Sequence, residues 1–234
     1  SCFDGDDGKA TVSVVNASSP PYTYLWDDPN NQTASTASNL DAGIFTVIVT
    51  SVTGCSDTDT VIINEPLALE LEIDIASNYS GSDIKCHGES NGAAIVSLFS
   101  GGTAPFSYVW VDSTTSLTLP SDSSYAGSLA AGTYYLTIKD SLDCEIEDTI
   151  WLVDPPPLTF DFTADSISCF GYCNGEIIVD ITASEGGTTT PVNGYQYIWT
   201  YPSGVPQTTQ NSSLSNLCEE GDYYLEVQDA NGCV

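Results

Sequence analysis

The stretch Gly101-Gly-Thr-Ala-Pro-Phe-Ser-Tyr-Val-Trp-Val111 decides the fold, because a Gly/Pro turn leads directly into a strand that carries a tryptophan. The same strand recurs as Tyr22-Thr-Tyr-Leu-Trp26 and as Tyr195-Gln-Tyr-Ile-Trp199. A fixed period of this length indicates one small domain that is repeated three times. A closing cysteine ends each copy, at an interval of 89 residues (144 − 55 and 233 − 144): Cys55, Cys144 and Cys233.

Outward from this strand, the middle repeat consists of short apolar segments separated by turn residues. Leu67–Ile75 alternates apolar and mainly acidic residues with a period of two, which is typical of a half-buried strand. Further strands are predicted at Ala93–Phe99, Phe106–Val111, Tyr135–Lys139 and Thr149–Val153, and no segment has a sustained helical period. The sequence therefore predicts an all-β fold, a tandem array of three immunoglobulin-like β-sandwich domains.

Prolines mark the predicted domain boundaries, at Glu65-Pro66 and at Asp154-Pro-Pro-Pro157. They fix φ and favour stiff, extended junctions. The predicted domains are residues 1–66, 67–155 and 156–234. The first lacks a strand ahead of its first cysteine and the third lacks a strand after its last. We therefore expect a segment of a longer protein whose export signal and anchor lie elsewhere.

The charge of the chain excludes several classes of partner. There are 32 acidic residues, three lysines and no arginine, and the formal net charge is −29. Nucleic acid is excluded as a partner because phosphate binding needs lysine or arginine, and anionic membrane surfaces are disfavoured by the same repulsion. No apolar run is long enough to span a bilayer, so we expect no direct membrane insertion.

The sequence offers little for catalysis. His87 is the single histidine and occurs in one repeat only, so a Ser/His or Cys/His dyad could not recur in each copy. No acidic residue recurs at a matched, evidently buried position in all three copies. We therefore expect no enzyme activity, no catalytic residue and no cofactor, with calcium as the one ion to consider.

Eight cysteines, an even number at matching positions, indicate an oxidising compartment and hence an extracellular protein. Position predicts pairing within each repeat, between an opening cysteine ahead of the second strand and the closing cysteine after the sixth, both at one end of the sandwich. The two cysteines that only the third repeat has are expected to pair with each other. The predicted bridges are Cys2–Cys55, Cys86–Cys144, Cys169–Cys233 and Cys173–Cys218.

Aromatic residues recur at two positions of the repeat. The tryptophan of the third strand is interpreted as a core residue that packs across the sandwich, with sugar stacking as the alternative. Tyr134 and Tyr223 stand where a tyrosine corner is expected, and Phe45 replaces the hydroxyl group in the first repeat.

These motifs, in this order, resemble the SprB repeat. The pattern C-x-G-x-x-[DN]-G is present in Cys86–Gly92 and Cys169–Gly175, with a near match in Cys2–Gly8, and the ending D-x-x-G-C is present at Asp229–Cys233. The G-G-x-x-P-[YF]-x-Y-x-W core and the L-x-x-G-x-Y corner complete the resemblance. It implies a large surface protein of Bacteroidota, like the mobile gliding adhesin that the type IX secretion system exports.

The resemblance implies a non-catalytic, structural and adhesive role, as a rod-like stalk or filament of stacked domains. Its partners would be neighbouring repeats of the same chain, surface glycans or other cell-surface proteins. It also implies O-glycosylation at Asp-[Ser/Thr]-[aliphatic/Thr] sites, which would make the chain a glycoprotein. The candidate acceptors are Thr60, Ser113, Ser141, Thr149 and Ser166.

Asp4-Gly-Asp-Asp-Gly8 resembles the oxygen-rich turn of a calcium loop, with Asp4, Asp6 and Asp7 as candidate ligands. It lacks the bidentate glutamate of an EF-hand, because the twelfth position is Val15. A turn that needs Gly and Asn for positive φ explains the same residue types without calcium. Two alternatives to the stalk stay open here: an array of glycan-binding modules and a calcium-stiffened surface rod.

Overall fold

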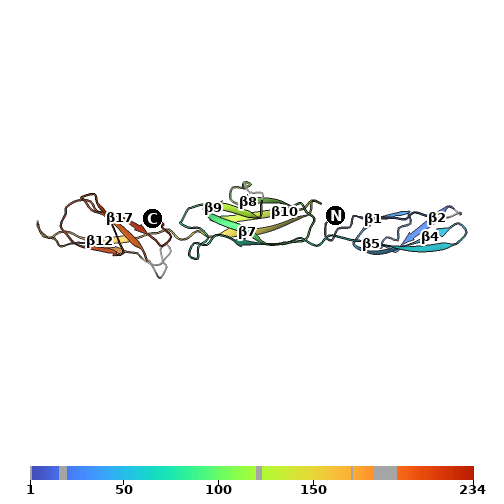
Figure 1. Cartoon of the computed structure of the whole chain (residues 1–234), viewed down its shortest axis with the longest axis horizontal. Coiled ribbons are helices and arrows are strands. Elements are labelled where there is room, and N and C mark those ends of the chain that lie inside the picture. Colours follow the sequence, from blue (N-terminus) through green and yellow to red (C-terminus); the bar gives the residue numbers. More distant parts are fainter. Residues whose placement is uncertain (1, 16–19, 120–122, 170, 182–193) are drawn as a thin grey trace. The chain divides into compact units, whose positions relative to one another are not determined.

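A computed structural model of the chain describes residues 2–15, 20–119, 123–169, 171–181 and 194–234. The ordered elements among these residues are all β-strands (Figure 1). The described chain forms two compact units, and each is described by itself. Unit 1 comprises Ser1–Glu72, Ser97–Val109 and Thr137–Asp148, and unit 2 comprises Ile73–Val96, Trp110–Leu136 and Thr149–Val234. Both units contain parts of the middle repeat, so the domain limits at residues 66 and 155 stay a prediction.

The first repeat has two antiparallel sheets that enclose one core. Its strands are β1 (Gly8–Thr11), β2 (Tyr22–Trp26), β3 (Thr36–Leu40), β4 (Gly43–Ser51) and β5 (Ser56–Ile63). The sheet orders are β1-β3 and β2-β4-β5. Residues of both sheets are buried together in the core: Ala10, Trp26, Ala37, Leu40 and Val47.

The middle repeat contains six strands in two sheets. They are β6 (Glu70–Ile75), β7 (Gly92–Ser100), β8 (Ser107–Asp112), β9 (Tyr125–Leu129), β10 (Gly132–Lys139) and β11 (Glu145–Leu152). The sheet orders are β6-β7-β9 and β11-β10-β8. The five strands expected from the sequence are present here, and β9 lies in the polar segment between β8 and β10.

The third repeat follows the same plan. Its strands are β12 (Asp161–Asp165), β13 (Gly175–Asp180), β14 (Gln196–Thr200), β15 (Pro206–Thr209), β16 (Ser213–Leu217) and β17 (Tyr224–Gln228). The sheet orders are β12-β13-β16 and β15-β14-β17. Each described sheet takes all its strands from one repeat, and the prediction of tandem immunoglobulin-like sandwiches is confirmed.

The tryptophan of the third strand is a core residue in every repeat. Trp26, Trp110 and Trp199 are each at most 2% exposed, so their faces are not available to stack on a sugar. The indole N–H of Trp26 donates to Ala34 O at 3.0 Å, and that of Trp110 donates to Ser123 O at 2.9 Å. The corresponding Trp199 Nε1 has no partner among the described residues.

The tyrosine corner is present where the sequence predicted it. The Tyr134 hydroxyl donates to Ala130 O at 3.0 Å, and the Tyr223 hydroxyl donates to Glu219 O at 3.1 Å. Each bond joins the start of a strand to the carbonyl four residues earlier, which fixes the corner. Phe45 packs against the first core without such a bond.

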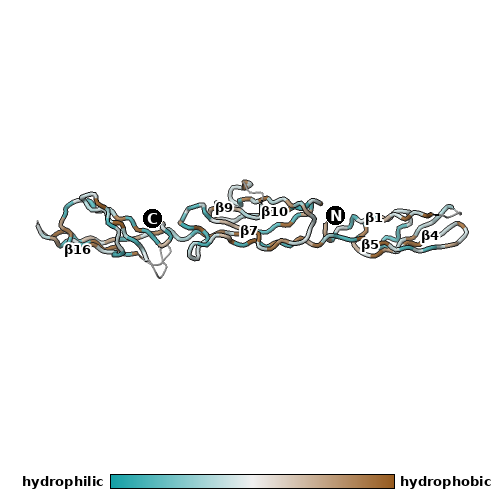
Figure 2. The backbone as a smooth tube through the Cα atoms, in the orientation of Figure 1, coloured by the Kyte–Doolittle hydropathy of each residue, from teal (hydrophilic) through white to brown (hydrophobic). Residues whose placement is uncertain are grey.

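Hydrophobic and hydrophilic residues alternate along the chain, as Figure 2 shows, because one face of each strand is buried and the other is solvated. In β10, for example, Tyr134, Leu136 and Ile138 are buried while Tyr135 between them is 46% exposed. Within the part of the chain that the structure describes, no helix is long and apolar enough to cross a membrane.

Candidate functional site

The opening and closing cysteines of a repeat lie at opposite ends of its strands. Gly8, which follows the opening loop, pairs with Leu40 and approaches Ile63, so it lies near the start of β4 and the end of β5. Cys55 lies at the other end of β4, whose nine residues span about 30 Å at 3.3 Å each. A disulfide requires Cα atoms about 4.4–6.8 Å apart. A bridge within the repeat is therefore geometrically excluded.

Three of the four predicted disulfides are consequently wrong: Cys2–Cys55, Cys86–Cys144 and Cys169–Cys233. The structure instead joins Cys2 to Cys144 and Cys86 to Cys233, with Cα–Cα distances of 5.4 and 5.5 Å. Each bridge links the opening cysteine of one repeat to the closing cysteine of the next. We call each such contact region a joint. The first joint lies in unit 1 and the second lies in unit 2.

The third repeat contains the additional Cys173–Cys218 bridge that the sequence predicted, with a Cα–Cα distance of 4.2 Å. Cys173 precedes β13 and Cys218 follows β16. Because Gly175 pairs with Leu217 across these two strands, the two cysteines lie side by side. This bridge closes one sandwich and takes no part in a joint.

The closing turn has the same hydrogen bonds in all three repeats. The residue four positions before the closing cysteine donates its N–H to that cysteine's carbonyl, at 2.8–3.0 Å. Its side-chain oxygen accepts the cysteine N–H: from Cys55 at Ser51, from Cys144 at Asp140 and from Cys233 at Asp229. The residue before each closing cysteine has positive φ: Gly54, Asp143 and Gly232. The turn thus presents each closing cysteine in the same backbone setting.

The opening loop, from the opening cysteine to the glycine six residues later, is also repeated. The carbonyl of each opening cysteine accepts the N–H of the residue three positions later: Gly5, Glu89 and Tyr172. Two positions after the cysteine the backbone has positive φ in each case: Asp4, Gly88 and Gly171. The predicted turn with positive φ at glycine is therefore present in the middle and third repeats, but Asn91 and Asn174 do not have positive φ.

The Asn-Gly pairs, Asn91-Gly92 and Asn174-Gly175, stabilise the opening loops in two ways. Asn91 Oδ1 accepts the Lys85 N–H at 2.8 Å, and Asn174 Oδ1 accepts the Ser168 N–H at 3.1 Å, so the asparagine holds the loop closed. Gly92 is needed for space, because a Cβ there would lie 2.3 Å from Leu152 Cδ2. Both residues therefore serve the loop that carries the opening cysteine.

An acidic residue immediately before proline fastens the opening loop at both joints. In unit 1, Glu65 Oε2 accepts the Asp4 N–H at 2.7 Å. In unit 2, the carboxylate of Asp154 accepts the equivalent N–H of Gly88 at 3.0–3.1 Å. The same positions in two repeats thus make the same contact, so the boundary segments hold the loops as well as linking the repeats.

The second joint has further polar contacts. His87 Nδ1 lies 3.0 Å from Asp154 Oδ2 and 2.9 Å from Pro155 O. The side-chain amide of Asn231, in the closing turn, donates to Tyr79 O at 3.3 Å. The Asn231 bond connects the third repeat to the middle one in addition to the disulfide, and the His87 contacts hold the opening loop to the boundary segment of the middle repeat. The single histidine therefore has a structural position at a joint.

Each joint also has a cleft beside its disulfide. In unit 1 a cleft of about 350 Å³ is lined by Cys2 and Phe3 of the first repeat and by Leu67, Gly102 and Cys144 of the second. In unit 2 a cleft of about 160 Å³ is lined by Cys86, His87, Leu158 and Cys233. In both joints the opening loop thus packs against the neighbouring repeat beside the closing cysteine.

Asp140 supplies the main electrostatic feature of the first joint. Its burial alone would raise the pKa, but hydrogen bonds from the N–H groups of Cys144, Thr103 and Leu142 outweigh it and lower the pKa. Nearby, Lys139 Nζ lies 3.1 Å from both Asp143 Oδ1 and Glu145 Oε1. The hydrogen bonds that Lys139 donates to the carboxylates of Glu145 and Asp143 raise the pKa of the lysine.

The structure does not gather the predicted calcium ligands. No group of three or more acidic, cysteine or histidine side chains that could hold a metal is found among the described residues, which include Asp4, Asp6 and Asp7. The backbone of Asp4 is held by Glu65 instead. These aspartates stay a prediction that only a binding measurement addresses.

The predicted glycosylation acceptors lie at separate places. Thr60 is exposed in β5 and Thr149 is exposed in β11. Ser141 is exposed in the closing turn of the middle repeat, and its hydroxyl donates to Thr103 O at 2.9 Å. Ser113 is half-buried after β8, and Ser166 is exposed after β12. Their occupancy stays a prediction.

Residues 1–31 and 78–115 match the family described as the SprB repeat. Both segments are thus similar to the SprB repeat. The two matched segments include the opening loops of the first and middle repeats and their tryptophan strands, which are the motifs that carry the resemblance in the sequence. The sequence has no match among curated proteins.

Two solved structures illustrate what the chain is similar to. One comprises the three N-terminal domains of the highly immunogenic outer capsid protein (Hoc) of bacteriophage RB49. It is 18% identical, with a TM-score of 0.39, and the match covers 88% of this chain and 75% of that one. The other is trypsin-activated alpha-2-macroglobulin from Escherichia coli, 13% identical with a TM-score of 0.20, where the match covers 97% of this chain and 21% of that one.

Sequence reasoning missed the residues that hold the joints. Glu65 and Asp154 were used only to mark boundaries, yet each accepts a hydrogen bond from an opening loop. Asp140 and Asp229 were part of a motif without an assigned task, yet each accepts its closing cysteine's N–H. The signal that could have found them is the recurrence of an acid directly before proline and of an acid four residues before cysteine.

Proposed function

We propose that this chain is a non-catalytic, load-bearing segment of a secreted surface protein, serving as a stalk in adhesion or gliding motility. The SprB repeats support a surface location, and the disulfides agree with an oxidising exterior. The observation that carries the proposal is the overlap of the two joint bridges, because Cys86 lies inside the loop closed by Cys2–Cys144.

Overlapping bridges limit how far an unfolded chain can be drawn out. From Cys2 to Cys233 the polypeptide alone has 231 steps, about 790 Å when fully extended. The two joint bridges leave a covalent route from Cys2 to Cys144, back to Cys86 and across to Cys233, with 58 backbone steps (144 − 86), about 200 Å. The Cys173–Cys218 bridge of the third repeat shortens the forward route from Cys144 to Cys233 to 44 steps (173 − 144 and 233 − 218), about 150 Å. A stalk built in this way stays short under tension even when its domains unfold.

Single-molecule pulling of the chain from its two termini tests the proposal. It is done on a protein with Cys173 and Cys218 both replaced by serine, so that only the joint bridges shorten the chain. We expect complete unfolding to bring Cys2 and Cys233 to about 200 Å apart in the oxidised protein and to about 790 Å apart in the fully reduced protein. The informative double variant on this background is Cys86→Ser with Cys233→Ser. It leaves 89 steps (233 − 144) after the Cys2–Cys144 bridge, about 300 Å.

Pairing within repeats would give the same double variant 178 steps (233 − 55), about 600 Å, and that value would contradict the joint bridges. On cells that display the chain, loss of both joint bridges should weaken attachment under flow while the amount of protein on the surface stays the same. Equal attachment would remove the load-bearing role. Glycan binding and calcium binding stay predictions from the sequence.

A further inference from the structure

Two cysteines of the joint type have no bridge in this chain. Cys55 is a closing cysteine and Cys169 is an opening cysteine, and both are exposed. Their equivalents are all bridged, always from the opening cysteine of one repeat to the closing cysteine of the next along the chain. Cys55 and Cys169 are therefore the two complementary halves of one further joint.

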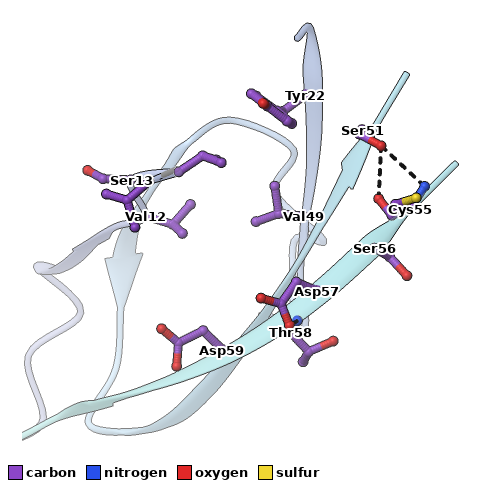
Figure 3. A pocket seen from close by; sticks show the side chains of 12 residues that line it. Val12, Ser13, Tyr22, Val49, Ser51, Cys55, Ser56, Asp57, Thr58 and Asp59 are labelled. Atoms are coloured by element: carbon purple, nitrogen blue, oxygen red, sulfur yellow. Dashed lines mark hydrogen bonds between the residues drawn. The ribbon is translucent and has the colours of Figure 1, made fainter. Parts of the chain in front are cut away.

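The closing turn of Cys55 already has the geometry of a joint. The Ser51 N–H donates to Cys55 O at 2.8 Å, as the aspartates do at Cys144 and Cys233. Ser51 Oγ accepts the Cys55 N–H at 3.2 Å, and the same hydroxyl donates to Cys55 O, as Figure 3 shows. Forming a bridge at Cys55 thus requires no new backbone conformation there.

The opening loop of Cys169 has the geometry of the complementary half. Cys169 O accepts the Tyr172 N–H at 3.0 Å, as Cys86 O accepts the Glu89 N–H at 3.0 Å. Gly171 has a φ of 83°, close to the 77° of Gly88, and Asn174 closes the loop as Asn91 does. The loop is shaped as it is at the occupied second joint.

A cleft beside Cys55 could accommodate the opening loop of Cys169 (Figure 3). It measures about 390 Å³ and is lined on one side by Tyr22 and Val49 and on another by the segment Val12–Val15, of which Val15 is 77% exposed. At the first joint, Cys2 and Phe3 of the preceding repeat's opening loop lie beside Cys144, together with the segment Leu67–Leu69 of the middle repeat itself. The described part of the first repeat has neither an opening loop of another repeat nor a segment equivalent to Leu67–Leu69 at this place, so the cleft at Cys55 is open.

Charge favours the loop of Cys169 as the occupant. Asp57 and Asp59 lie at the edge of the cleft, so an uncharged loop meets less repulsion there than an acidic one. The segment from Cys169 to Gly175 carries no charged residue, and its Tyr172 is 63% exposed. Burying this ring against the valines of the cleft would remove apolar surface from water on both sides.

We propose that Cys55 and its cleft are a docking site for the opening loop of another SprB repeat, supplied here by Cys169 of a second copy of this chain. The copies then join through a Cys169–Cys55 disulfide. Because the two surfaces differ, the contact is heterologous and can continue from copy to copy. The bridge forms by thiol–disulfide exchange. One cysteine thiolate first attacks glutathione disulfide, which gives a mixed disulfide and releases one glutathione. The other cysteine thiolate then attacks the mixed disulfide and releases the second glutathione, so two thiols are oxidised and one glutathione disulfide is reduced.

Two single variants test the docking site. Cys55→Ser retains only the Cys169 half, and Cys169→Ser retains only the Cys55 half. Incubated together in a glutathione redox buffer, they should form one disulfide-linked dimer. Each variant incubated alone at the same total concentration should stay largely monomeric. Non-reducing electrophoresis and mass spectrometry of the linked peptides measure the products.

In the unsubstituted chain, random oxidation would place about half of the intermolecular bridges between Cys55 and Cys169, since two thiols of equal reactivity combine statistically. We expect a several-fold excess of this bridge over the two symmetric ones. A statistical mixture, a preference for symmetric bridges, or no linkage in the mixed sample would overturn the proposal. The proposal does not depend on the load-bearing role, because the pulling experiment follows the bridges already present.

Discussion

Asp140 is the residue on which the first joint depends, because its carboxylate accepts three backbone N–H groups in a buried place. Oδ1 accepts those of Leu142 and Cys144 at 2.8 and 2.9 Å, and Oδ2 accepts that of Thr103 at 2.9 Å. It is 5% exposed. Three donors stabilise the ionised form, so the lowered pKa and the shape of the closing turn have one cause.

We expect Asp140→Asn to lower the melting temperature at pH 7 by several degrees, because an amide nitrogen would face N–H donors. The folded pKa of Asp140 lies below the ordinary 3.8, so its contribution is present above that value and is lost as the pH falls through the lowered pKa. The variant should therefore lose less stability than the unsubstituted protein as the pH falls from 5 to below 3.8. Thermal melts followed by circular dichroism measure both effects. The exposed Asp41→Asn is the control, and equal pH profiles for all three proteins would contradict the role.

At the scale of the element, the strand that follows each opening loop begins where the backbone passes very close to its neighbours. A Cβ on Gly8, at the start of β1, would lie 2.4 Å from Leu40 O. On Gly92, at the start of β7, it would lie 2.3 Å from Leu152 Cδ2 and 2.6 Å from Ile84 Cδ1. Glycine is required at both positions by space, although neither has positive φ.

Gly92→Ala should therefore destabilise the protein by about 1–3 kcal/mol, as overpacking of a dense core does. Gly127→Ala in β9 is the matched control, since its Cβ would approach only Tyr125, an exposed side chain that can move. Urea unfolding measures both variants. A Gly92→Ala protein as stable as the control would show that the start of β7 has room the structure does not indicate.

At the scale of the whole molecule, the net charge of −29 opposes folding by self-repulsion. We expect added NaCl to raise the melting temperature steadily up to about 0.15 M, where the Debye length falls to about 8 Å. Calorimetry measures the effect. At equal concentrations, CaCl2 and MgCl2 should give equal further shifts. A larger shift with calcium would instead indicate a specific calcium site, for which Asp4, Asp6 and Asp7 are the candidate ligands.

Sequence by itself determined the strands, the buried tryptophans, the tyrosine corner and the Cys173–Cys218 bridge. These features depend on local periodicity or on contacts inside one sandwich, and a repeated pattern reports both. The repeat also places Glu65 and Asp154 at equivalent positions directly before proline, although the sequence did not predict their contacts.

Only the tertiary structure decided which cysteines meet. Matched positions in a repeat show that two cysteines are equivalent, but they do not show at which end of the strands each one lies. The direction of β4 carries Cys55 about 30 Å away from the end where the opening loop lies, and the next repeat along the chain places its closing cysteine there instead. The partner of each opening cysteine therefore comes from another repeat, because a disulfide forms only between residues that the fold brings within a few ångströms.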